Sequence, residues 1–198
     1  MNGIALVISG PAGVGKTTLC DRLLLDYKTI LSRVITVTTR SPREGEKDGK
    51  DYLFISKPEF EELILKQAFI EYAQIHDNYY GSLKKTVQQL FYNNHDVLLN
   101  IDVQGASTLK KLEEEYNFLK SRVFSVFVMP KSLYDLKERL KSRGTDSEKE
   151  IEKRLKTATT EIQLHKKFDF VINSKSKNED YNELSNFYTQ HSKILLEC

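Results

Sequence analysis

The sequence has few cysteines, little net charge and no long apolar run, and each of these deficits excludes a class of protein. Cys20 and Cys198 are the two cysteines among 198 residues, and they stand far apart without metal-ligand spacing. We therefore expect neither a disulfide framework nor a zinc site, and a reducing cytoplasm fits the composition best. Thirty basic against 28 acidic residues give a formal charge of +2, which argues against a protein that mainly binds nucleic acid.

Apolar runs are too short to cross a membrane. The apolar start at residues 3–8 lacks a basic leader and ends at Gly10 and Pro11, so we interpret it as a buried strand rather than a signal peptide. The four histidines share no ligand spacing and receive no role. Tryptophan is absent, but ten tyrosines and ten phenylalanines supply bulky apolar surface. A single domain of ordinary globular composition is therefore expected.

Apolar segments alternate with charged stretches of helical period. Strands are expected at residues 4–8, 34–37, 97–101, 123–129 and 170–172. The intervening stretches favour crossover helices, which predicts a three-layer α/β sandwich with a mainly parallel sheet. Residues 179–196 place Tyr181, Leu184, Phe187, Ile194 and Leu195 roughly on one helical face, so this helix should pack against the core.

Two stretches break this alternation. Residues 37–90 surround a charged helix with short aromatic strands at 52–54 and 69–75, which indicates an inserted mixed α+β lobe. Residues 135–167 form two charged helical segments joined at 143–147, where Gly144 and a capping Ser or Asp would break and restart the helix. We interpret them as a mobile helical lid. The core would then comprise residues 1–36, 91–134 and 168–198.

Residues 10–17 read G-P-A-G-V-G-K-T, the P-loop pattern, and they lie between a predicted strand and a predicted helix. Backbone N–H groups of such a loop converge on phosphate oxygens, and Lys16 adds a charge between the β- and γ-phosphates. Thr17 could bind Mg²⁺, and Asp102 at the end of strand 96–102 could hold it through water. The alternatives are a chance glycine-rich turn for the loop, and a helix cap or solvated strand end for Asp102. The pattern predicts a bound nucleoside triphosphate and leaves the acceptor open.

Further motifs indicate the acceptor. They are the T-V-T-T-R-S-P-R-E-G-E-K-D-G-K-D-Y segment at 36–52, Glu71, Y-Y-G-S at 79–82, I-D-V-Q-G at 101–105 and R-G-T-D-S-E at 143–148. In this order they resemble the guanylate kinase family, and the resemblance extends from residue 4 to residue 173. It implies a P-loop NTPase fold with a GMP-binding lobe and a lid. The implied reaction moves the γ-phosphoryl group of ATP to GMP, and to dGMP, with Mg²⁺, in a monomer or homodimer that needs neither nucleic acid nor membrane.

The acceptor phosphate should meet Arg40 and Arg43, which are three residues apart in a Pro- and Gly-containing loop. Two guanidinium groups at this spacing can converge on one dianion, and Tyr52 and Tyr80 can donate to it. The alternative is surface ion pairing with nearby acidic residues such as Glu46. The resemblance assigns the GMP site to Thr36, Arg40, Arg43, Glu46, Tyr52, Glu71, Tyr80, Gly81, Ser82, Asn100, Asp102 and Arg154.

Guanine presents N1–H and N2–H₂ donors beside an O6 acceptor, so its recognition needs a carboxylate next to a hydroxyl. Glu71 and Ser82 supply this pair by resemblance, while a solvated position on an edge strand is the alternative for Glu71. Thr36 stands where the family usually has Ser, which is conservative. Asn100 stands where many members have Asp, which removes a negative charge near the base and the metal.

The lid contributes arginines. Arg139 and Arg143 are four apart on a predicted helix and share a face, while Arg154 lies on the next segment. By resemblance Arg139 and Arg143 hold the donor phosphates, Arg154 bridges toward the acceptor, and Asn173 contacts adenine. The alternatives are salt bridges with Glu138, Asp135 or Glu150, and a turn-forming role for Asn173. The resulting ATP site is Gly10, Pro11, Ala12, Gly13, Val14, Gly15, Lys16, Thr17, Thr18, Arg139, Arg143 and Asn173, and the catalytic set is Lys16, Arg40, Arg139, Arg143 and Arg154.

Two other functions share these motifs. A non-catalytic guanylate-kinase-like module of a scaffold protein would bind phosphorylated partners through the same lobe, but Lys16 and Thr17 argue against it. A P-loop kinase with another acceptor is opposed by Glu71 and Ser82 alone.

Overall fold

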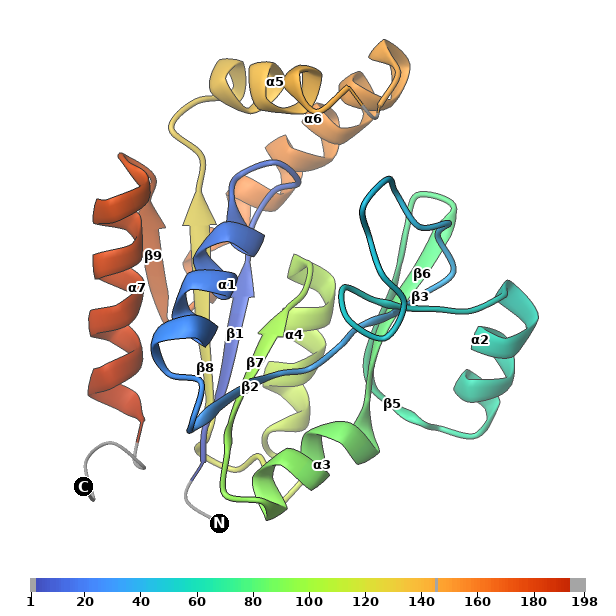
Figure 1. Cartoon of the computed structure of the whole chain (residues 1–198), viewed down its shortest axis with the longest axis vertical. Helices are drawn as coiled ribbons and strands as arrows, with labels where there is room; N and C mark the ends of the chain where they lie inside the picture. The colour runs from blue at the N-terminus through green and yellow to red at the C-terminus, as the bar shows by residue number, and fades with distance from the viewer. Residues whose placement is uncertain (1–2, 145, 193–198) are drawn as a thin grey trace.

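A five-stranded sheet forms the centre of the protein, whose computed structural model describes residues 3–144 and 146–192 (Figure 1). Its strands are β1 (Ala5–Ser9), β2 (Leu31–Arg33), β7 (Asp96–Asn100), β8 (Val123–Met129) and β9 (Phe170–Asn173), in the order β2-β7-β1-β8-β9. All four neighbouring pairs are parallel. Strands of a parallel sheet are covered on both faces, which explains why their sequences are nearly continuous apolar runs.

Helices cover both faces of this sheet. On one face, α1 (Lys16–Asp26) and α7 (Lys177–His191) pack in a core cluster with Leu6 and Ile8 of β1. On the other face, α3 (Lys84–Tyr92) and α4 (Val103–Leu112) pack with Ala5 and Val7 of the same strand. Successive side chains of β1 point to opposite faces of the sheet and therefore pack in two separate cores. The predicted three-layer α/β sandwich with a parallel sheet is confirmed.

A second sheet stands beside the core sheet (Figure 1). Its strands are β3 (Val37–Thr38), β4 (Leu53–Phe54), β5 (Phe69–Ile75) and β6 (Asn78–Leu83), in the order β4-β3-β6-β5. Helix α2 (Lys57–Leu65) begins with a capping box formed by Ser56 and Glu59. It buries Phe60 against Phe69 in a third core cluster. We call residues 37–83 the small lobe.

Two further helices lie beyond the carboxyl ends of the core strands (Figure 1). They are α5 (Leu133–Ser142) and α6 (Glu148–Gln163), and a short 3₁₀ helix (His165–Lys167) follows. Ser132 and Ser147 cap their amino ends by accepting hydrogen bonds from the amides of Asp135 and Glu150. We call α5 and α6 the helix pair. None of the helices within residues 3–144 and 146–192 has the length and hydropathy needed to cross a membrane.

The structure corrects three expectations. No strand spans residues 34–37, because the chain there crosses from the core sheet to the small lobe; Val34 packs in the core and Val37 in the lobe. The core strand is β2, which lies just before this segment. The apolar run at residues 34–37 therefore indicates burial and not strand pairing. Strand β6 was not expected at all. The final helix ends at His191, and the predicted contribution of Ile194 and Leu195 lies outside the described residues.

Candidate active site

The glycine-rich loop joins β1 to α1. Gly15 is the N-cap of α1, with φ 112°, a conformation that non-glycine residues rarely adopt. A Cβ on Gly10 would lie 2.5 Å from the Val128 carbonyl oxygen, so the loop can lie this close to β8 only with glycine there. Lys16 Nζ donates to the carbonyl oxygens of Gly10 and Pro11. Burial lowers the pKa of Lys16, whereas Glu161 raises it.

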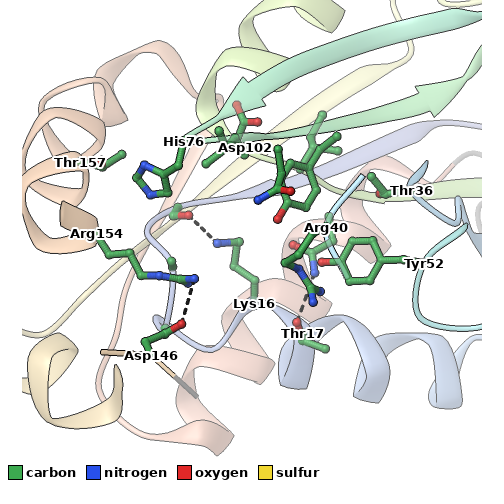
Figure 2. Close-up of a pocket in the computed structure, with 18 of the residues that line it drawn as sticks. Lys16, Thr17, Thr36, Arg40, Tyr52, His76, Asp102, Asp146, Arg154 and Thr157 are labelled. Atoms are coloured by element: carbon green, nitrogen blue, oxygen red, sulfur yellow. Dashed lines mark hydrogen bonds and ion pairs between the residues drawn. The ribbon is translucent and has the colours of Figure 1, made fainter. Parts of the chain in front are cut away.

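One cavity of about 460 Å³ joins this loop to the small lobe and the helix pair. In Figure 2, Lys16 lies between Arg154 and Asp146 on one side and Arg40 and Tyr52 on the other. The predicted site residues that line the cavity are Gly10, Ala12, Gly13, Gly15, Lys16, Thr17, Thr18, Thr36, Arg40, Arg43, Tyr52, Glu71, Tyr80, Asn100, Asp102, Arg143 and Arg154. The cavity thus joins segments that lie far apart in the sequence, from Gly10 to Glu161.

The β3–β4 connection presents Arg40 and Arg43 to the cavity. Glu46 fixes this loop, because its two oxygens each accept from Arg40 Nη2 at 2.9 Å and Oε2 also accepts from the Arg43 amide at 2.8 Å. The Arg40 guanidinium lies 5.3 Å from the centre of the Tyr52 ring. The ion pair considered as an alternative for Arg40 is thus present. Glu46 binds only the backbone amide of Arg43, so the Arg43 side chain can face the cavity. Both arginines therefore have N–H groups that could bind an anion there.

Glu71 is buried, with 3% of its surface exposed, although β5 is an edge strand. The solvated position considered for it is therefore wrong. Ser82, its register partner on β6, is fully buried, and neither Glu71 Oε1 nor Ser82 Oγ has a hydrogen-bond partner among the described residues. Buried polar groups are rarely left unpaired, so this pair is available to a ligand.

Helix α4 makes the room for Glu71. A Cβ on Gly105 would lie 2.4 Å from Glu71 Oε2, so only glycine permits this close approach. Burial raises the pKa of Glu71 to about 7, and the Asp102 carboxylate contributes to the rise. Thr36 is buried and lines the same cavity.

The helix pair brings Arg143 and Arg154 into the cavity, but not Arg139. Arg139 Nη1 instead donates to the Val14 carbonyl oxygen at 2.8 Å, so it contacts the P-loop from outside the cavity. The acidic partner of Arg154 is Asp146, with Nη2 3.1 Å from Oδ1, rather than Glu138, Asp135 or Glu150. Arg43 Nη2 lies 3.9 Å from the same oxygen.

Comparison with known proteins agrees with this geometry. Residues 3–191 match the family model described as guanylate kinase. The chain belongs to the guanylate kinase family. It is 47% identical over 170 residues to the guanylate kinase of Clostridioides difficile (86% of this chain, 79% of the relative) and 40% identical over 183 residues to that of Wolbachia sp. subsp. Brugia malayi (92% and 90%).

A solved structure shows the same relationship. The chain is similar to the crystal structure of guanylate kinase from Anaplasma phagocytophilum, with a TM-score of 0.76 and 31% identity, covering 96% of this chain and 87% of that one. The family comprises nucleoside monophosphate kinases, ATP:GMP phosphotransferases of P-loop NTPase fold. A P-loop open to a cavity with a buried carboxylate is consistent with that membership.

Thr17 and Asp102 are the residues expected to hold a magnesium ion, and both line the cavity together with Asn100. Asn100 Nδ2 lies 3.4 Å from Thr17 Oγ1. Asp102 is also the N-cap of α4, because Oδ1 accepts from the amides of Gln104 and Gly105 at 2.6 and 3.0 Å, as the helix-cap alternative proposed. Burial raises its pKa, whereas these two amides and Lys16 lower it.

These donors fit Mg²⁺. Residues 3–144 and 146–192 contain no group of three or more His, Cys, Asp or Glu that could hold a metal. Magnesium needs no such cage, since it takes one or two protein oxygens and completes its shell with water and substrate phosphates. The Thr17 hydroxyl and the Asp102 carboxylate, which line one cavity, supply this kind of oxygen.

Some predicted site residues lie outside the cavity. Asn173 is exposed at the end of β9. Gly81 serves packing, since a Cβ there would lie 2.8 Å from the Phe69 ring. Ser82, the register partner of Glu71 on β6, is fully buried and does not line the cavity. The others that do not line the cavity are Pro11, Val14, Glu46 and Arg139.

One face of α6 and the β5–β6 turn line the cavity without having been predicted from the sequence. Glu150, Thr157 and Glu161 line the cavity with Arg154, and their spacing of four, three and four residues is the helical repeat that could have revealed them. Burial raises the pKa of Glu161 to about 7. The other cavity residues that were missed are Ser41, Ile75, His76, Asp77, Asn78, Ile101, Asp146 and Lys153. The sequence did not indicate the turn residues as part of the site, because strand β6 was not predicted.

Proposed function

We propose that this chain transfers the γ-phosphoryl group of ATP to GMP, giving ADP and GDP, and that dGMP is a second acceptor. The observation that carries this proposal is the single cavity that joins the P-loop to two arginines and a buried carboxylate. A phosphoryl donor and a guanine monophosphate can meet there without leaving the protein. This activity would place the chain in cytoplasmic purine nucleotide metabolism, as a monomer or homodimer that needs neither nucleic acid nor membrane.

On the donor side, the P-loop amides would bind the ATP phosphates. Lys16 would exchange its bonds to the Gly10 and Pro11 carbonyls for phosphate oxygens. Arg143, which faces the cavity, would neutralise charge on the transferred group. Arg139 would act beside it after leaving the Val14 carbonyl, and Asn173 would contact adenine from the end of β9.

On the acceptor side, Arg40, Arg43, Tyr52 and Tyr80 would bind the GMP phosphate, with Glu46 holding the arginine loop. The Glu71 carboxylate would accept from guanine N1–H and N2–H₂, while the Ser82 and Thr36 hydroxyls would donate to O6. The unpartnered atoms of Glu71 and Ser82 support this assignment. Purines lacking these donors would leave buried groups unpaired, which a site of this kind rejects strongly.

The chemistry needs positioning more than a base, because the attacking GMP phosphate is already an anion. Phosphoryl transfer spreads charge over the equatorial oxygens of a loose transition state, and Lys16, Arg143 and Arg154 would stabilise that charge. Bound Mg²⁺ would neutralise the donor phosphates. Thr17 and Asp102 would hold it, Asp102 through water, with Asn100 beside them.

Closure of the cavity would exclude water, which would otherwise attack the same phosphate. We propose that residues 37–90 and 135–167 move as lobe and lid against a core of residues 1–36, 91–134 and 168–198. Two ion pairs between the lobe and the lid support this proposal. Asp146 lies 3.9 Å from Arg43 of the lobe, and Lys153 lies 3.7 Å from Asp77.

A coupled assay with Mg²⁺, ATP and five acceptors tests the function. We expect turnover with GMP and dGMP and little with AMP, CMP or UMP. Lys16→Ala should lower kcat by about 10²- to 10³-fold, whereas Lys28→Ala, an exposed lysine just beyond α1, should change nothing. Turnover of another monophosphate at the rate of GMP would support the other-acceptor kinase, and inactivity toward all five would support the scaffold module.

A further inference from the structure

Asp146 is a buried carboxylate in the short connection between α5 and α6. Its side chain is only 4% exposed, although its neighbours Gly144, Ser147 and Glu148 are exposed. Burying a carboxylate is unfavourable unless cations or donors compensate it. The surroundings of Asp146 therefore need to supply positive charge.

Two parts of the protein supply that charge. Asp146 Oδ1 lies 3.1 Å from Arg154 Nη2 of α6 and 3.9 Å from Arg43 Nη2 of the small lobe. Figure 2 shows the Arg154 ion pair at the edge of the cavity beside Lys16. One carboxylate oxygen thus joins a lid arginine to a lobe arginine.

A third guanidinium group, that of Arg143, lines the same cavity as Arg43, Arg154 and Asp146. Burial lowers the pKa of Arg143, Arg43 and Arg154 lower it further, and Asp146 raises it. Three like charges that line one cavity repel each other. Asp146 is the buried counter-charge that lets them remain together before any phosphate binds.

The other oxygen of this carboxylate, Oδ2, is buried and has no hydrogen-bond partner among the described residues. Each guanidinium group carries five N–H donors in a planar fork. Contact with one carboxylate oxygen therefore leaves most donors of Arg43 and Arg154 free for a phosphate. Asp146 can remain in place when the acceptor arrives.

We propose that Asp146 is a positioning residue that holds Arg43 of the small lobe and Arg154 of α6 against each other, so that both address the acceptor phosphate. This role rests on the proposed function, since it presupposes a monophosphate in the cavity. It assigns to Asp146 the coupling of lobe to lid: binding of the phosphate by either arginine orients the other.

Steady-state kinetics of Asp146→Asn test this role, because the substitution removes the charge and keeps the shape. We expect KM for GMP to rise about tenfold and kcat to fall about threefold, with KM for ATP within about twofold of wild type. Asp146→Glu, which keeps the charge, should recover part of the loss. Glu152→Gln makes the same charge change at an exposed position of α6 and should have no effect.

A double-mutant cycle shows whether Asp146 acts through its arginine. In an Arg154→Met background, Asp146→Asn should have a much smaller effect on KM for GMP. Additive effects would overturn the proposal, and so would a glutamate variant as impaired as the asparagine one. A lower KM for GMP in Asp146→Asn would overturn it too, by showing that the carboxylate competes with phosphate.

The wild-type assay separates the two levels of inference. No turnover of GMP by the wild-type chain would contradict the proposed function itself. Normal turnover by the wild type together with unchanged kinetics of Asp146→Asn would contradict only the positioning role. Thermal denaturation of each variant, compared with wild type, shows that the kinetic changes are measured on folded protein.

Discussion

Protonation of Glu71 should make GMP binding depend on pH between 6 and 8. The carboxylate must be ionised to accept both guanine donors, and burial raises its pKa to about 7 in the ligand-free protein. The apparent dissociation constant scales as one plus the ratio of protonated to ionised Glu71. With this pKa the factor is about 1.1 at pH 8 and about 11 at pH 6, so affinity should weaken about tenfold across the range.

Titration calorimetry of GMP into the ligand-free protein at pH 6, 7 and 8 measures this effect. The GMP phosphate itself titrates with a pKa of about 6, so Glu71→Gln serves as the reference that keeps the phosphate titration and lacks the carboxylate. The variant should bind at least about tenfold more weakly at pH 8, and the gap should narrow at pH 6. Equal pH dependence in both proteins would refute the assignment of Glu71 to the base.

Two further predictions concern the same residues. The folded state binds the Glu71 proton more tightly than the unfolded state, so the stability that this proton contributes is lost as pH rises from about 4.5 to about 7. At pH 8, Glu71→Gln should therefore unfold at a higher urea concentration than wild type, with a free energy of unfolding larger by at most about 3 kcal/mol. Near pH 4.5 the two proteins should be equally stable. Unchanged relative stability at the two pH values would contradict the buried ionisation. Gly105→Ala places a methyl group 2.4 Å from Glu71 Oε2 and should raise KM for GMP about tenfold without altering KM for ATP. Ser107→Ala on the same helix is the control, and a normal KM for GMP in Gly105→Ala would show that the contact is not needed.

Short-range patterns in the sequence were sufficient for the fold class and the P-loop. Residues 10–17 are contiguous, so their spacing alone indicates a loop between strand and helix, and the structure places them between β1 and α1. Parallel strands buried on both faces appear as apolar runs, which located four of the five core strands. The run at 34–37 misled because Val34 and Val37 are buried in two different cores, a distinction that hydropathy does not carry.

Contacts between distant segments decided the rest. Glu71 occupies an edge strand, and its burial depends on Gly105 of α4 and Ser82 of β6. The Asp146 side chain is buried where it meets Arg43 of the small lobe and Arg154 of α6. A single acidic residue in a charged stretch carries no sign of either partner.

The sequence by itself determined the alternation of strands and helices and the residue types able to bind phosphate, because these follow from local periodicity and spacing. The tertiary structure decided which charges meet, which of them lose water, and which oxygens remain unpaired in the cavity. Burial and electrostatic interaction depend on distances in space, and those distances are set by the packing of the small lobe and the helix pair against the core.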